Sequence, residues 1–169
     1  MLAKKHHPWI FTLNIIIFAF ILLLDTSGFL NISIKNATPL LCLPLLCSYA
    51  IFAPLGRSAL AGFVIGAMLD STASGSYCFN TICFLLLGAF ITLSANNLFN
   101  KNIRASIALA VIVSIIYFTA RWLCFMAFGV GIKNSLIYLL SYALPSAVYS
   151  AVFILPFFYI YRHLSILKN

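Results

Sequence analysis

The sequence predicts an all-α membrane protein, a single domain of residues 1–169 with six transmembrane helices. Of the 169 residues, 64% are hydrophobic and only 7% are charged. The mean hydropathy is +1.11, and a soluble domain of this size could not hide so much apolar surface. The apolar residues also fall into six runs, most of them close to the ~20 residues that span the hydrocarbon core of a bilayer.

The first run ends at Asp25, and because no small-residue cleavage site precedes this acid, we expect a retained helix rather than a signal peptide. The second run contains Pro44, which should kink it, and closes at the basic turn Gly56-Arg57. The six runs occupy residues 9–24, about 38–55, 58–71, 77–99, 103–130 and 135–161.

The lengths of the later runs differ. The third is short, so it either tilts or ends inside the bilayer near Asp70. The fifth and sixth are long enough to tilt or to project beyond the lipid, and Pro145 and Pro156 should bend the sixth.

The basic residues predict that both termini are cytoplasmic, because cytoplasmic loops of membrane proteins are enriched in Lys and Arg. With six spans, seven of the ten basic residues fall on the side of the termini and two on the other side. Arg121 falls inside the fifth run. The seven are Lys4, Lys5, Arg57, Lys101, Arg104, Arg162 and Lys168, and the two are Lys35 and Lys133.

Composition also excludes several functions. The net charge of +8 comes from residues at the ends of apolar runs, so lipid headgroups and topology explain it better than nucleic-acid binding. The five cysteines lie in apolar runs at spacings that match no common metal or redox motif, so we expect packing roles and neither a metal nor a cofactor. With two acids, no catalytic triad and no phosphate-binding loop, the chain is predicted not to be an enzyme.

The segment from Gly62 to Asp70 is the most informative. Gly62, Gly66 and Asp70 are four residues apart, so they share one face of a helix. Two glycines at this spacing let a neighbouring helix approach closely. An ionisable side chain in the same seam is costly in lipid and therefore points to a role.

Asp70 and Arg121 are the two charges expected within lipid depth. Asp70 lies roughly 20 Å from the start of its span and Arg121 about 26 Å from the start of its own, so an ion pair between the third and fifth helices is one interpretation. In the alternative, Asp70 caps the outer end of the third helix or starts a polar turn through Gly75. Arg121 then extends to the surface and stacks on Trp122.

Several short motifs follow one another along the chain. They are the turn Gly56-Arg57, the segment Gly62-Phe-Val-Ile-Gly66-Ala-Met-Leu-Asp70, the turn through Gly75, Asn80, Leu85-Leu-Leu-Gly88 and Leu155-Pro-Phe-Phe-Tyr-Ile-Tyr-Arg162. The order of these motifs resembles the MreD family, the rod shape-determining inner-membrane proteins of bacteria. The family pattern often has a glycine just before the Asn, where this chain has Cys78-Phe79, and this difference bears on how closely the third and fourth helices approach.

The resemblance implies a non-enzymatic, multi-pass subunit of the elongation machinery in the bacterial inner membrane. Such proteins are similar in fold to the S subunits of energy-coupling-factor transporters. They are expected to bind MreC, a single-pass protein, and through it MreB and the RodA–transpeptidase synthase. Contacts with membrane lipids are also expected, and whether the chain forms a homo-oligomer is left open. The seam of Gly62, Gly66 and Asp70, with Gly75 and Arg121, is then either an internal packing face or a groove for the partner helix.

A second interpretation is an S-type subunit that binds a vitamin or a metal and delivers it to an energising module. S subunits typically carry an Ala-x-x-x-Ala face on the first helix for docking. The first run here is bulky nearly throughout, with Ala19 alone, which favours the scaffold over the transporter.

Overall fold

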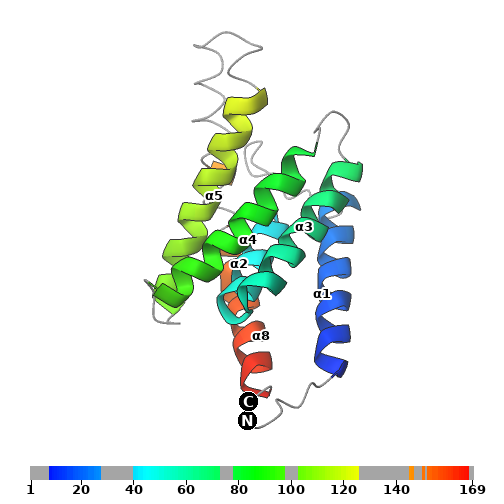
Figure 1. Cartoon of the computed structure of the whole chain (residues 1–169), viewed down its shortest axis with the longest axis vertical. Coiled ribbons are helices and arrows are strands. Elements are labelled where there is room, and N and C mark those ends of the chain that lie inside the picture. Colours follow the sequence, from blue (N-terminus) through cyan, green and yellow to red (C-terminus); the bar gives the residue numbers. More distant parts are fainter. Residues whose placement is uncertain are drawn as a thin grey trace.

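The computed structural model describes residues 8–27, 40–72, 78–97, 103–125, 145–146, 150 and 152–167. The regular elements in these residues are α-helices, so the predicted all-α class is confirmed for the described part of the chain. Gly75 and most of the first half of the predicted sixth span lie outside it. The six described helices are α1 (Pro8–Ser27), α2 (Cys42–Phe52), α3 (Leu55–Thr72), α4 (Phe79–Asn97), α5 (Ile103–Phe125) and α8 (Ile154–Leu167), arranged as Figure 1 shows.

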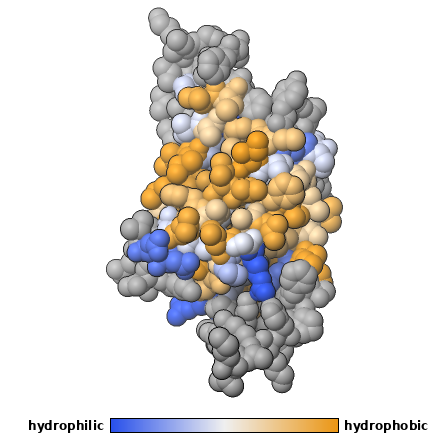
Figure 2. All heavy atoms as spheres, in the orientation of Figure 1, coloured by the Kyte–Doolittle hydropathy of each residue, from blue (hydrophilic) through white to orange (hydrophobic). Residues whose placement is uncertain are grey.

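Two stretches of the described helices are long and apolar enough to cross a membrane by length and composition: Phe79–Asn97, and Ser106–Cys124 within α5. Leu13–Asp25 in α1 and the whole of α2 are apolar but shorter. Figure 2 shows apolar side chains across the middle of the face formed by α3, α4 and α5, with hydrophilic residues below them and at the upper right. Six membrane crossings and cytoplasmic termini stay predictions.

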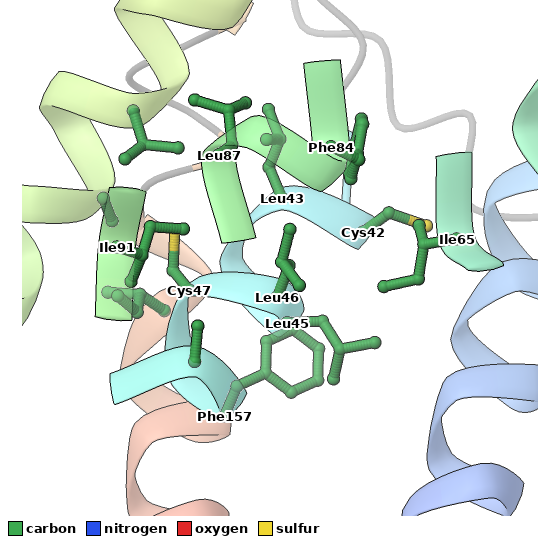
Figure 3. Close-up of a cluster of buried hydrophobic side chains, with 14 of the residues drawn as sticks. Cys42, Leu43, Leu45, Leu46, Cys47, Ile65, Phe84, Leu87, Ile91 and Phe157 are labelled. Atoms are coloured by element: carbon green, nitrogen blue, oxygen red, sulfur yellow. The ribbon is translucent and has the colours of Figure 1, made fainter. Parts of the chain in front are cut away.

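Helix α2 lies at the centre of the described helices and packs against α1, α3, α4, α5 and α8. Residues 42 to 48 are all buried, and a helix that is apolar on every side is one that packs inside a protein. Figure 3 shows Leu43, Leu45 and Leu46 of α2 among side chains of α3, α4 and α8. With 11 residues α2 is roughly 16 Å long, shorter than the span predicted for it.

Proline explains where α2 begins. Pro44 is the third residue of the helix, in the first turn, where backbone N–H groups have no helical partner and a missing N–H costs nothing. The predicted kink at Pro44 is therefore wrong, because the helix starts at Cys42 rather than several residues earlier. Pro156 likewise lies in the first turn of α8, which begins directly after a turn at Phe153, and the bend predicted at Pro156 stays a prediction.

Proline also explains where α2 ends. Ala53 is extended, with φ −93° and ψ 153°, the conformation favoured before a proline. The N–H groups of Arg57 and Ser58 then donate to the carbonyl of Pro54 and open α3. The connection is therefore Ala53-Pro54, and Gly56-Arg57 lies in the first turn of α3 rather than in the predicted turn.

Candidate functional site

Glycines bring the backbones of α3 and α4 into contact. Gly62 and Gly66 are both buried on α3. A Cβ on Gly66 would lie 2.5 Å from the carbonyl oxygen of Asn80 and from Cα of Thr81, and a Cβ on Gly62 would overlap the carbonyl of Phe84. Both glycines thus lie directly against the backbone of α4.

A third glycine completes this seam from the other side. A Cβ on Gly88 of α4 would lie 2.5 Å from the carbonyl oxygen of Ser58 of α3. The contacts step by four residues in opposite directions along the two helices, so α3 and α4 form an antiparallel hairpin. The approach is close although Cys78-Phe79 replace the glycine of the family pattern.

The structure therefore fills the predicted seam with α4. Partner binding through Gly62 and Gly66 stays a prediction, and it would require α3 and α4 to separate. Gly75, the other glycine of the predicted site, lies outside the described residues.

Asp70 holds the beginning of α4. Its Oδ1 accepts a hydrogen bond from the N–H of Asn80 at 3.2 Å. Its Oδ2 accepts bonds from the N–H of Thr81 at 2.8 Å and from the Thr81 hydroxyl at 2.6 Å. The first N–H groups of a helix lack internal partners and carry partial positive charge, so a half-buried carboxylate is stabilised there.

Asp25, which the sequence suggested only as the outer end of the first helix, makes the same contact one hairpin earlier. Its two carboxylate oxygens accept hydrogen bonds from the N–H groups of Leu41 and Cys42, both at 3.0 Å. The N–H of Leu40 donates to the hydroxyl of Ser150 at 2.9 Å. The beginning of α2 is therefore satisfied by side chains from other parts of the chain.

A sequence signal for this shared role exists. Asp25 is followed by Thr-Ser and Asp70 by Ser-Thr, each is preceded by Leu, and each lies two residues before the end of its helix. Leu-Asp-hydroxyl-hydroxyl thus recurs at the ends of α1 and α3. This shared role was not predicted from the sequence.

Arg121 is connected to Asp70 through two intervening residues. The Tyr117 hydroxyl of α5 donates to Oδ1 of Asn80 at 2.7 Å, and the exposed Arg121 interacts electrostatically with the same hydroxyl. Asn80 in turn donates its backbone N–H to Asp70. The polar chain therefore joins α3, α4 and α5, while a direct pair between Asp70 and Arg121 stays a prediction.

A buried threonine joins three helices near the other end of the hairpin. The Thr92 hydroxyl of α4 donates to the carbonyl of Ala50 at 2.9 Å and lies 2.6 Å from the Ser58 hydroxyl of α3. In a continuous helix the Ala50 carbonyl would accept from residue 54, but Pro54 has no N–H. Thr92 thus satisfies a carbonyl that proline leaves without its helical donor.

The chemistry of this region is hydrogen bonding between helices. Cys42 and Cys47 are buried free thiols in α2. Within the described residues, no three His, Cys, Asp or Glu side chains form a group that could hold a metal ion.

These features define a class: an all-helical membrane protein whose polar side chains hold its helices to one another. A family model described as rod shape-determining protein MreD matches residues 5–165. The chain belongs to the MreD family and is a rod shape-determining membrane protein. No curated protein and no solved structure matches it.

Proposed function

We propose that the chain is a multi-pass scaffold of the bacterial inner membrane, with both termini in the cytoplasm. It binds an MreC-like single-pass protein and through it connects MreB and the RodA–transpeptidase synthase to control of cell shape. Membership of the MreD family supports this role. Nothing supports the alternative of a transporter S subunit.

The hydrogen bonding of the two side-chain carboxylates is the observation that carries the proposal. The chain has only two acidic residues, Asp25 and Asp70, and both accept hydrogen bonds from the first turn of the following helix. A carboxylate engaged in this way is a poor general base, because proton abstraction would break the bonds that hold the helix. The arrangement favours a structural role over catalysis.

Lateral docking in lipid requires outward apolar side chains, and the α3–α4 hairpin provides them. Its exposed residues include Leu60, Val64 and Met68 on α3 and Ile82, Leu86 and Leu93 on α4. Among the predicted partner-binding residues that the structure describes, Arg121 is the exposed charged one. We propose that Arg121 contributes to contact with the partner.

Co-purification tests this role. The tagged chain, extracted in mild detergent from cells that express it at native level, should retain a single-pass coiled-coil protein, identified by mass spectrometry. Arg121→Ala should lower its recovery, whereas Thr119→Ala, an exposed control on the same helix, should not. Recovery of two ATPases with a coupling subunit would overturn the scaffold in favour of transport.

A further inference from the structure

Helix α5 continues past the point where α4 begins, as Figure 1 shows. The Tyr117 hydroxyl donates to Oδ1 of Asn80, in the first turn of α4. The Tyr117 ring also packs against Phe79 and Phe84, with centroids 6.3 and 5.3 Å away, so Tyr117 is level with the beginning of α4. Because α5 runs on to Phe125, its last part extends roughly 12 Å beyond this contact.

The side of α5 that packs against its neighbours continues into this extension. Ala110, Val113 and Tyr117 are buried. Arg121 and Cys124 follow at intervals of four and three residues, so they lie on the same side of the helix. Both are nevertheless exposed. The packing side of α5 is therefore left open where the helix passes the beginning of α4.

Lipid tails are a poor cover for this open side of α5. On α3 the exposed apolar side chains give way to the exposed Ser71 and Thr72 at the end of the helix. This polar end of α3 is joined to Tyr117 through Asn80. Arg121 lies one turn farther along α5 than Tyr117, so it is at the polar surface of the membrane rather than among acyl chains.

Arg121 is the charged residue of this open side, and the acids of the chain are engaged elsewhere. Asp25 and Asp70 both accept hydrogen bonds from the beginnings of helices, and the chain has no other acidic side chain. Arg121 itself interacts electrostatically with the hydroxyl of Tyr117. Since a guanidinium group pairs with a carboxylate through two parallel hydrogen bonds, a partner that supplies Asp or Glu complements this side of α5.

We propose that this open end of α5 binds an acidic segment of the single-pass partner, at the level where the partner helix leaves the outer side of the membrane. A carboxylate of that segment pairs with Arg121, and the small side chains of Ala120 and Cys124 let its backbone approach. The site is continuous with the α3–α4 hairpin on which the partner is proposed to dock, since Met68 and Ile82 are exposed near the same end. The assignment rests on the proposed function, because it gives that same partner a second contact outside the hydrocarbon.

Photo-cross-linking in cells tests where the partner lies. Benzoylphenylalanine replaces Cys124 in the full chain or, as the matched control, Thr119, which is exposed on the opposite side of α5. Under illumination, position 124 should cross-link a single-pass protein, and position 119 should not. Mass spectrometry of the cross-linked peptide should place an Asp or Glu within about one helical turn of the attachment point.

Charge reversal tests the ion pair. Arg121→Glu should lower recovery of the partner about tenfold or more, because two carboxylates then face each other, whereas Arg121→Lys should retain most of it. Replacing the cross-linked acid of the partner by lysine should lower recovery with the parent chain and restore it with Arg121→Glu. Circular dichroism checks that Arg121→Glu is folded, and if it is not, the lysine variant of the partner alone measures the loss.

Two results would overturn the proposal and leave the scaffold in place. In one, the partner cross-links from position 119 but not from position 124, so it docks from the lipid side alone. In the other, Arg121→Glu leaves recovery of the partner unchanged and instead loses bound phosphatidylglycerol in native mass spectrometry, which would assign Arg121 to a lipid headgroup. Failure of the parent chain to retain any single-pass protein would overturn the proposed function itself, and the assignment of Arg121 with it.

Discussion

At the residue scale, Asp25 and Asp70 show how a helix start can be satisfied without water. Each carboxylate reaches from the end of one helix to the first N–H groups of the next. In lipid these groups would otherwise stay unpaired at high cost. The sequence placed Asp70 correctly on the glycine face, but it could not show which helix the carboxylate would meet.

Asp70→Asn should destabilise the protein by about 1–3 kcal/mol, because an amide offers one acceptor where the carboxylate offers two. Unfolding in mixed micelles measures the change, and Ser71→Ala, at an exposed neighbour, should cost little.

If Asp70 also pairs with Arg121, the double variant with Arg121→Ala should cost less than the sum of the two single changes. Strict additivity would rule out that pair.

Cys78 has φ 60°, a left-handed conformation that costs a residue with a Cβ about 1 kcal/mol or more. Cys78→Gly should therefore raise the stability by roughly 0.5–1 kcal/mol, because glycine adopts this conformation without strain. Thermal unfolding in detergent is a suitable measurement. Cys78→Ala retains a Cβ, so an equal gain from alanine would show that the backbone is not the cause.

At the element scale, the sequence predicted some helices much better than others. The runs 58–71 and 77–99 correspond closely to α3 and α4, because their ends carry polar and small residues. The second run was assigned as a full span, whereas α2 has 11 residues. An apolar run looks the same whether it faces lipid or other helices, and only packing against five neighbours distinguishes the two.

Only one side of the α3–α4 seam, the face of α3, could be predicted from the sequence. Helical periodicity places Gly62, Gly66 and Asp70 on one face, and the structure places that face against α4. Periodicity does not identify the neighbouring helix, and Gly88 gave no signal that it lies in the same seam. Asp25 was missed because its bonds to α2 bridge 16 and 17 residues of sequence.

Gly66→Ala or Gly88→Ala should destabilise the hairpin by about 1–3 kcal/mol, since the new Cβ would force the two backbones apart. Gly56→Ala is the matched control: it lies in the first turn of α3 with open space around it, so it should be neutral or slightly stabilising. Unfolding followed by circular dichroism in detergent compares them. Equal effects at Gly56 and Gly66 would mean that helix propensity, not contact with α4, governs the seam.

At the scale of the whole molecule, polar groups lie at both ends of the helices. Asp25 and Asp70 make their contacts where α1 and α3 finish, whereas Arg57 lies where α3 starts. The beginning of α1 and the end of α8 lie at the same lower end in Figure 1. This arrangement agrees with an even number of membrane crossings.

Reporter fusions test that topology directly. Seven of the ten basic residues fall on the side of the termini, so both termini are expected in the cytoplasm. Alkaline phosphatase fused to either terminus should therefore be inactive, and a fluorescent protein fused to either terminus should be bright. Phosphatase inserted after residue 74, in the connection that follows Asp70, should be active, since that connection is predicted to be periplasmic. Termini on opposite sides of the membrane would require an odd number of crossings, and the six-span scaffold would then be wrong.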